Sequence, residues 1–190
     1  DIIEDTAIQS EDSGFIEDTA HSDTDDFDTA APQDPEEEDC EPVVYQPNPF
    51  ITEVVEVEFG EGAGFGQDQF PDIVFGPPLG AGPNSGSLDV VTIGNEGFLT
   101  VAFDQKIVDG TGPDLIVFEN VFIGWYETGI ISASTDGETW YTWDCDPLDA
   151  DNDFPGCAGA SPSLSHPDNC INAQDPELAG GDAFDLADIG

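Results

Sequence analysis

Positive side chains are almost absent from this sequence, and that absence constrains its folding more than any other feature. One lysine, Lys106, and no arginine stand against 43 acidic residues, which gives a formal net charge of −42 over 190 residues. Such a chain repels itself unless other charges cancel its field. Because the sequence holds almost no cations, we expect metal ions, salt or a cationic partner to supply that charge. Nucleic acids and anionic membranes are bound through Lys/Arg clusters, so the composition excludes both as partners.

The composition changes near residue 41 and divides the chain into two parts. Residues 1–41 are rich in Asp, Glu, Thr and Ser and poor in aromatics, which is typical of a segment that does not fold alone. Within them Ile-Glu-Asp-Thr-Ala at residues 3–7 returns at residues 16–20. We expect residues 1–41 to be an acidic extension, either a solvated linker or a segment that contacts neighbouring copies. Residues 42–190 are long enough for a single domain.

Four cysteines in a Gly/Pro-rich, strand-like sequence predict two disulfides and an oxidising compartment. Cys145 and Cys157 bracket a short acidic loop that a bond between them would close. Cys40 and Cys170 are then left to pair, which would anchor the extension to the domain. A zinc site is the alternative, but the sequence contains no CxxC pair. The sequence begins without Met and has no run of eighteen apolar residues, so we expect a processed, exported chain with no membrane insertion.

Short strands and turns dominate the sequence from residue 43 onward. Apolar and acidic residues alternate over residues 51–59, which is the period of a half-buried strand. An Asp136-Gly137 turn at the centre of residues 130–143 predicts a tight hairpin with positive φ at both turn residues. The pattern as a whole predicts an all-β fold, an antiparallel β-sandwich or jelly roll. Other expected elements are strands at 88–93, 98–104 and 114–122, a Gly/Pro-rich connection at 60–87 and a short helical turn within 176–186.

Several stretches of the sequence carry a resemblance to a known family. They include Gly-Ser-Leu-Asp-Val-Val at 86–91 and Ser-Thr-Asp-Gly-Glu-Thr-Trp at 134–140. Together and in this order the stretches resemble a family of bacterial surface proteins of myxobacteria and planctomycetes. The second stretch is also similar to the hairpin of discoidin-type, galactose-binding-like jelly rolls. The resemblance implies an exported, calcium-dependent β-sandwich, and its remaining stretches are residues 62–78, 107–120 and 179–190.

Members of that family continue past the Asp-Leu-Ala-Asp-Ile-Gly stretch of residues 185–190 into a final apolar strand, whereas this sequence stops at Gly190. A sheet edge left unfilled in this way would bind an extended segment offered to it. We therefore expect the extension of one copy to donate a strand to the next, giving a homo-oligomer or a head-to-tail polymer. The apolar side chains available for this assembly are Ile2, Ile3, Ile8, Phe15 and Ile16.

Two groups of acidic residues are the main candidates for binding Ca²⁺. Asp149, Asp151 and Asp153 have the Asp-x-Asp-x-Asp spacing that directs alternate carboxylates at one ion. The match to an EF-hand is incomplete, because Phe154 stands at the sixth position, and the alternative is a solvated acidic loop. The second group would use a shared helical face at residues 182–188, and its alternative is capping and turn formation. Its members are Asp114, Glu119, Asn120, Asp182, Asp185 and Asp188; a weaker set is Asp68, Asp72 and Asp89.

No catalytic arrangement stands out in the sequence. Ser165 and His166 lie in a Pro-rich loop and are expected to be ordinary surface residues. Trp125 and Trp143 could stack on sugars, although aromatic residues at strand spacing are more often core. We therefore expect a non-enzymatic, secreted or cell-surface structural protein that Ca²⁺ stabilises and that assembles through its N-terminal segment. The alternative is a calcium-dependent carbohydrate-binding adhesin.

Overall fold

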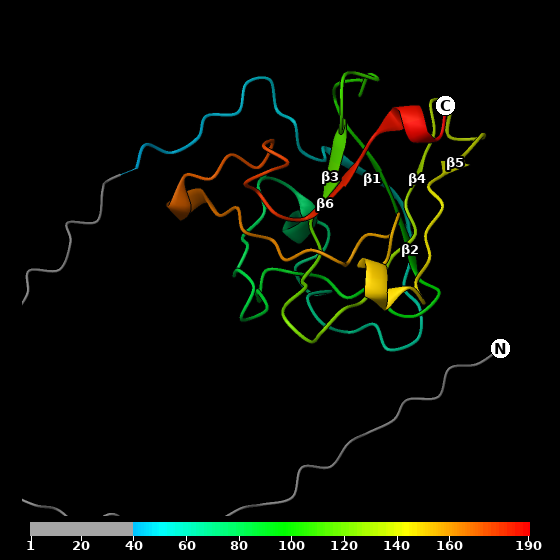
Figure 1. The fold of residues 1–190 in the computed structure, drawn as a ribbon, viewed down its shortest axis with the longest axis horizontal. Coiled ribbons are helices and arrows are strands. Elements are labelled where there is room, and N and C mark those ends of the chain that lie inside the picture. Colours follow the sequence, from blue (N-terminus) through cyan, green and yellow to red (C-terminus); the bar gives the residue numbers. More distant parts are fainter. Residues whose placement is uncertain (1–39) are drawn as a thin grey trace, which may run out of the picture. The chain divides into compact units, whose positions relative to one another are not determined.

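The computed structural model describes residues 40–190, and the predicted assembly residues from Ile2 to Ile16 lie outside this range. Within it the regular structure consists of short strands and 3₁₀-helices, with no α-helix (Figure 1). The strands are β1 (Glu53–Glu58), β2 (Phe98–Ala102), β3 (Leu115–Val117), β4 (Ser132–Ala133), β5 (Tyr141–Thr142) and β6 (Asp182–Phe184). The 3₁₀-helices are η1 (Asp72–Val74), η2 (Ala150–Asn152), η3 (Pro167–Asn169) and η4 (Leu186–Asp188).

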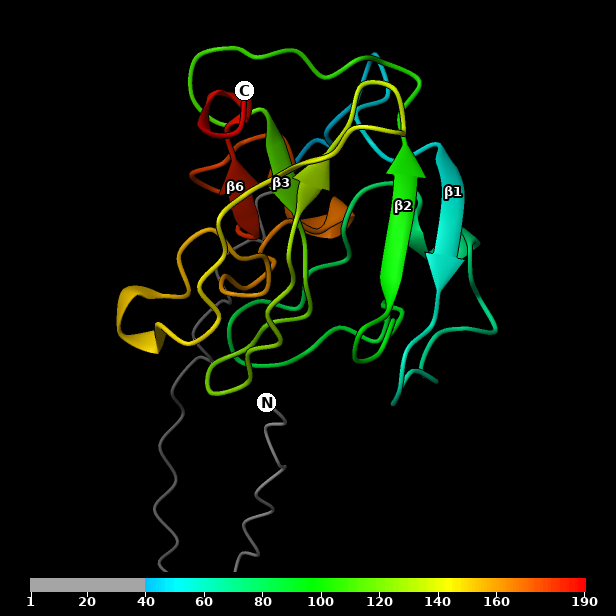
Figure 2. The same ribbon diagram turned by 90° about the vertical axis from the view of Figure 1, so that its right-hand side faces the viewer.

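The strands pair antiparallel in three separate sheets of two strands each: β1 with β2, β3 with β6, and β4 with β5. The first two pairs run as separate units in Figure 2. The described residues are therefore all-β, as the short strands and the frequent turns of the sequence predict. The pair β3–β6 joins strands that are distant in the sequence, with Leu115 opposite Phe184 and Val117 opposite Asp182. This pairing brings the start of β3 beside the end of β6.

The strands predicted at 51–59 and 98–104 are confirmed as β1 and β2, whereas the strand predicted at 88–93 is wrong. Residues 88–93 instead contact the Gly-rich connection through isolated hydrogen bonds, such as the one that Thr92 N donates to the Phe65 carbonyl (3.0 Å). A Cβ added to Gly66 would lie 2.0 Å from the Val90 carbonyl oxygen. The two backbones thus approach closely at a residue without a side chain, and no regular ladder forms.

The predicted hairpin forms, but its turn differs from the prediction. Strands β4 and β5 pair, and Gly137 has a φ of +72°, whereas Asp136 is not among the residues with positive φ. Side chains close the wider loop instead: Asp136 Oδ1 accepts hydrogen bonds from the backbone N–H of Glu138 (2.8 Å) and of Thr139 (2.7 Å). These backbone hydrogen bonds lower the pKa of Asp136. An Asx-type loop therefore replaces the expected two-residue turn.

The core is small and lies where β3–β6 meets the chain that follows β5. Its buried members are Trp143, Ala158 and Phe184, and the rings of Trp143 and Phe184 meet edge to face at 5.2 Å. The indole Nε1–H of Trp143 donates a hydrogen bond to the Asp185 carbonyl (3.0 Å), which satisfies the one polar atom of this side chain. The half-buried residues around this cluster are Leu115, Val117, Ile131, Ala133, Leu186 and Ile189.

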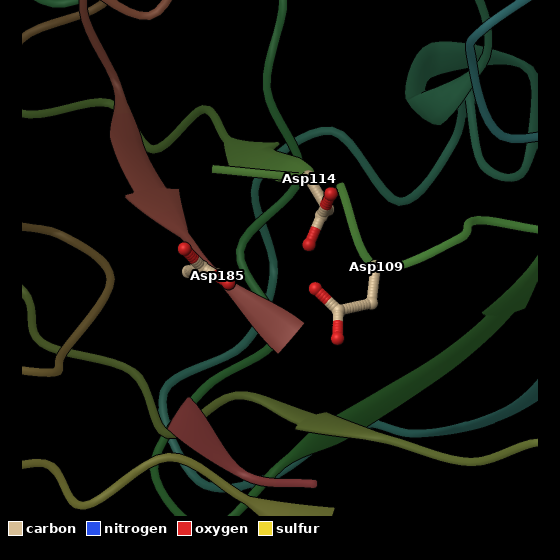
Figure 3. Close-up of side chains that lie close together, drawn as sticks. All are labelled: Asp109, Asp114 and Asp185. Atoms are coloured by element: carbon tan, nitrogen blue, oxygen red, sulfur yellow. The ribbon is translucent and has the colours of Figure 1, made fainter. Parts of the chain in front are cut away.

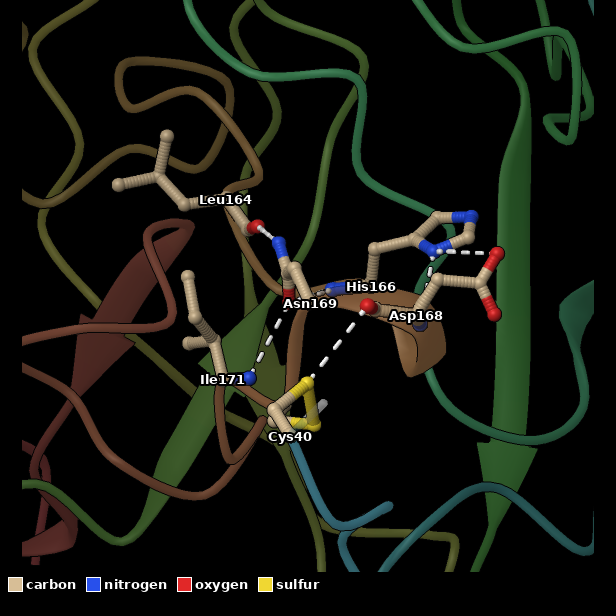
Figure 4. Close-up of polar contacts among 7 residues, drawn as sticks. Cys40, Leu164, His166, Asp168, Asn169 and Ile171 are labelled. Carbon is tan, nitrogen blue, oxygen red and sulfur yellow. Dashed lines mark hydrogen bonds and ion pairs between the residues drawn. A yellow bond between two sulfur atoms is a disulfide. The ribbon is translucent and has the colours of Figure 1, made fainter. Parts of the chain in front are cut away.

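Two disulfides confirm the predicted pairing, Cys40 with Cys170 and Cys145 with Cys157. The first holds the start of the described chain against η3. There His166 caps the helix by accepting a hydrogen bond at Nδ1 from the Asp168 N–H, and Asn169 links Leu164 to Ile171 (Figure 4). Tyr45 adds a second tie, since its hydroxyl accepts a hydrogen bond from Ala173 N (2.9 Å).

One expectation about this loop is wrong. Ser165, expected at the surface, is only 1% exposed, and its hydroxyl donates to the Ile171 carbonyl (2.8 Å). The buried hydroxyl therefore has a structural role, because it satisfies a carbonyl group next to the disulfide.

Candidate metal centre

Three carboxylates meet at one end of the β3–β6 pair. Asp109, Asp114 and Asp185 each place a carboxylate oxygen within 4.8 Å of the other two. In Figure 3 the carboxyl groups of Asp109 and Asp114 turn toward each other, with Asp185 beside them at the end of β6. Asp114 and Asp185 are half-buried, and Asp109 is exposed. This is the one group of three potential ligands with that geometry among residues 40–190.

Strand pairing explains why these residues meet. Asp114 immediately precedes β3 and Asp185 immediately follows β6, so the antiparallel register sets them side by side. The ladder extends one step further, because Asp114 N donates to the Phe184 carbonyl (2.9 Å). Asp109 joins them from the preceding loop, which Asp114 folds back by accepting a hydrogen bond from Gly110 N at Oδ1 (2.8 Å).

Two of the three residues also cap backbone groups. Asp114 Oδ2 accepts a hydrogen bond from Leu186 N (3.1 Å), and Asp185 Oδ1 accepts one from Ala187 N (2.9 Å) as the N-cap of η4. The alternative interpretation, capping and turn formation, is therefore correct for these two side chains. Capping is compatible with metal binding, because each carboxylate oxygen has two lone pairs. Within residues 40–190 the Asp109 carboxylate forms no hydrogen bond, so it is the least committed of the three.

This group of carboxylates could hold a metal ion. Hard cations such as Ca²⁺ and Mg²⁺ select oxygen ligands of this kind. Within residues 40–190 no Lys or Arg forms an ion pair with an acidic side chain, so no cation of that range neutralises the three carboxylates. A bound divalent ion would cancel their mutual repulsion.

The structure does not bring the Asp149, Asp151 and Asp153 carboxylates together at a similar distance. They lie in the loop that the Cys145–Cys157 disulfide closes, around η2. Both carboxylate oxygens of Asp149 accept hydrogen bonds from the Asn152 side-chain amide, at 2.9 and 2.7 Å. Asp153 follows η2 directly as its C-cap, and its backbone has the left-handed conformation. The alternating spacing thus serves a 3₁₀ turn, not a common point.

The other members of the second predicted group are separated by the fold. Asp182 belongs to β6 and is 7% exposed, and its Oδ2 accepts hydrogen bonds from Gly159 N and Ala160 N. Asn120 pairs its side-chain amide with the backbone of Ser87 in both directions. The shared helical face predicted for residues 182–188 is wrong, because Asp182 is in a strand and only Asp188 is inside η4.

Glu119 is placed apart from the three-aspartate group and has a perturbed proton affinity. The residue as a whole is exposed, but burial of its carboxyl group removes solvent from that group. Desolvation, followed by the negative charges of Asp182 and Glu127, raises the pKa of Glu119 to about 7. Its pKa in the folded protein then exceeds the ordinary value of 4.5 that it has in the unfolded chain. Its ionisation therefore destabilises the fold above about pH 7, and stability rises as the pH falls through the folded pKa.

A carbon-detected NMR titration of the Glu119 carboxyl group should give a midpoint near 7. Because Glu127 contributes to the shift, Glu127→Gln should lower this midpoint, whereas Glu138→Gln, at a residue that does not contribute to the shift, should leave it unchanged. A wild-type midpoint below 5 would contradict the environment described for this side chain.

The two tryptophans predicted as sugar platforms have different surroundings. Trp143 is 5% exposed and forms part of the core, so the sugar-stacking prediction is wrong for this residue. Trp125 is 56% exposed and stacks on Phe122 with ring centroids 6.1 Å apart. Only Trp125 of this pair therefore presents an indole ring to solvent.

Asp109 is absent from the predicted ligand groups, although the sequence around it carries a turn signal. Asp109 and Asp114 flank a Gly-Thr-Gly-Pro loop, whose composition is typical of a turn that brings its ends together. Within residues 40–190 no helix is long and apolar enough to cross a membrane. Comparison of the chain with protein-family models, curated proteins and solved structures finds no match. The resemblance to bacterial surface proteins therefore stays a prediction.

Proposed function

We propose that this chain is a non-enzymatic, extracellular structural protein whose domain is stabilised by Ca²⁺ bound at Asp109, Asp114 and Asp185. The observation that carries the proposal is the convergence of these three carboxylates at the end of the β3–β6 pair. A site here would tie the loop before β3 to the turn after β6. Both segments border the Trp143 core, so the ion would stabilise the domain as a whole.

The charge balance of the chain supports a cation as the stabilising ligand. With a formal net charge of −42, each divalent ion bound would reduce the self-repulsion of the folded state. Ca²⁺ is favoured over Mg²⁺ because Ca²⁺ accepts irregular sets of carboxylates, backbone carbonyls and waters. Mg²⁺ requires near-octahedral geometry and usually keeps several waters.

Two disulfides support an extracellular location, since such bonds persist in oxidising compartments. The small core supports an external source of stability, because many large apolar side chains remain exposed, among them Leu88 at 79% and Ile123 at 70%. Assembly of copies would cover such side chains and could complete the two-stranded sheets into a β-sandwich. We propose a homo-oligomer or polymer on this basis, formed through the N-terminal segment.

A carbohydrate-binding adhesin is the second candidate, and the exposure of Trp125 favours it. The indole face of an exposed tryptophan can stack on the apolar face of a sugar ring. The burial of Trp143 removes the second platform that a two-tryptophan sugar site would need. We therefore rank the structural role first.

Thermal unfolding with and without Ca²⁺ tests the proposal. At a free Ca²⁺ concentration one hundred times the Kd, we expect the Tm to rise by about 5–10 °C relative to protein in EDTA. Asp109→Asn should abolish the rise without disturbing the fold, because the Asp109 carboxylate accepts no hydrogen bond within residues 40–190. Asp151→Asn removes the same charge from an exposed position and should preserve the rise. An equal rise in wild type and Asp109→Asn would refute the assigned site.

A further inference from the structure

A cavity is lined by residues that follow β3 in the sequence, whereas Asp109 and Asp114 of the candidate calcium site precede β3. It has a volume of about 10 Å³, and its lining residues are Glu119, Asn120, Val121, Trp125 and Glu127. A space of this size holds one water-sized group. Val121 is 4% exposed, whereas Glu119, Trp125 and Glu127 are exposed residues. The cavity is therefore closed on its apolar side and accessible from solvent on the side of the carboxylates and the indole.

Backbone hydrogen bonds hold the lining residues in place. Trp125 N donates to the Phe122 carbonyl (2.8 Å), and the stacked rings of Phe122 and Trp125 fix the indole. Just after Glu127, Gly129 exchanges two hydrogen bonds with Ala158 (2.9 and 3.0 Å). The cavity is thus preorganised from two sides of the fold, which lowers the entropy lost on binding.

The chemistry of the lining selects a cation. Glu127 supplies a carboxylate, and Glu119 supplies a carboxyl group whose raised pKa of about 7 leaves it partly protonated at neutral pH until a cation binds beside it. The buried Asp182 is close enough to Glu119 to add its negative charge. No Lys or Arg within residues 40–190 forms an ion pair with any of them. Anions are repelled by this arrangement, and the aromatic ring adds an attraction for cations through its π-system.

Size and shape select the kind of cation. The carboxylates of Glu119, Glu127 and Asp182 do not form a group with oxygens within 4.8 Å of one another, as a directly bound metal ion would require. A guanidinium group is a plane of four heavy atoms and exceeds a water-sized space. A primary ammonium group is about as large as a water molecule, donates three hydrogen bonds and binds over indole rings.

We propose that the cavity lined by Glu119, Trp125 and Glu127 is a binding site for a primary ammonium group, donated by a lysine side chain or a small amine of another molecule. The two glutamates accept hydrogen bonds from the ammonium, and the Trp125 ring contacts its alkyl stem and its charge. This site gives the acidic chain a specific way to recognise a cationic partner. It is independent of the calcium site and of its ligands.

The test follows the indole N–H signal of Trp125 in ¹H–¹⁵N NMR spectra at 150 mM KCl, where general charge attraction is screened. The probe is Nα-acetyl-lysine methylamide, and the matched control is the norleucine derivative, which lacks the ammonium. We expect a saturable shift with the lysine derivative only. An equal shift with norleucine, or no saturable shift with lysine, would overturn the proposal.

Variants locate the site. Glu119→Gln combined with Glu127→Gln should weaken binding at least tenfold. Asp151→Asn combined with Glu177→Gln removes the same charge from exposed positions and should change the Kd less than twofold. Equal weakening by both pairs would show a general field effect and overturn the site.

A third probe, putrescine, distinguishes the source of the ammonium. Tighter binding of the lysine derivative supports a peptide ligand, and tighter binding of putrescine supports a free amine. Asp109→Asn should leave amine binding unchanged, so failure of this proposal and failure of the calcium site are separable.

Discussion

Replacing Trp143 by alanine is expected to unfold the domain or to leave it marginally stable. The side chain is 5% exposed, meets Phe184 edge to face and donates a hydrogen bond to the Asp185 carbonyl. Truncating a buried tryptophan costs about 3–5 kcal/mol, and the freed carbonyl loses its partner as well. Domains of this size have about 5–15 kcal/mol of stability in total, so little would remain. Calorimetric unfolding in Ca²⁺-containing buffer measures the loss.

Two further substitutions calibrate this result. Trp143→Phe keeps a ring in the core but removes the indole N–H, and should cost about 1–2 kcal/mol through the unpaired Asp185 carbonyl. Trp140, three positions earlier in the chain, is 46% exposed, and its replacement by alanine should change stability by no more than about 0.5 kcal/mol. If Trp140→Ala destabilised the domain as much as Trp143→Ala, the core would be located wrongly.

Removing the Cys40–Cys170 disulfide should destabilise the domain more than removing the Cys145–Cys157 disulfide. The first bond spans 130 positions of the sequence and the second spans 12. In the chain-entropy model these separations correspond to about 5 and about 3 kcal/mol, because the longer loop gains more freedom when the unfolded chain is released. Urea unfolding of the two double-serine variants measures both values under one condition.

The same pair of variants separates a global from a local effect. Loss of Cys40–Cys170 should also speed amide exchange at Ala173, whose N–H donates to the Tyr45 hydroxyl. Loss of Cys145–Cys157 should speed exchange in the η2 loop and leave Ala173 protected. A larger loss of stability from the Cys145–Cys157 variant would contradict the ranking.

Strands could be predicted from the sequence where side chains determine them. The alternation of residues 53–58 and the apolar run at 115–117 correspond to β1 and β3. Residues 88–93 have equally strand-like side chains, yet they lie against a glycine-rich backbone that offers no regular partner. Pairing depends on what lies opposite a segment, and a single sequence does not show that. The limited size of the sheets follows from the same cause.

The candidate site could be predicted in part for a similar reason. The sequence predicts Asp114 and Asp185 as ligands of one ion because hard cations select carboxylate oxygens, and the β3–β6 register does bring them together. The same ligand chemistry predicts Glu119 and Asn120, and the three-residue spacing to Asp185 on a helical turn predicts Asp182. Strand β3 separates Glu119 and Asn120 from Asp114, and β6 separates Asp182 from Asp185. The side chains of Asn120 and Asp182 accept hydrogen bonds from backbone N–H groups instead. The Asp-x-Asp-x-Asp spacing of Asp149, Asp151 and Asp153 is the more specific calcium motif in the sequence. In the structure, hydrogen bonds within the loop explain this spacing, and the three carboxylates do not share an ion position.

Counting the Ca²⁺ ions bound by each variant tests whether Asp109, Asp114 and Asp185 form the calcium site. Isothermal titration at 150 mM KCl separates one tight site from the weak attraction of a strongly acidic chain. We expect a saturable tight site in the wild type that Asp109→Asn eliminates. The triple change Asp149→Asn, Asp151→Asn, Asp153→Asn should leave that site intact. A tight site that survives Asp109→Asn and disappears in the triple variant would contradict the account and place the ion in the disulfide-closed loop.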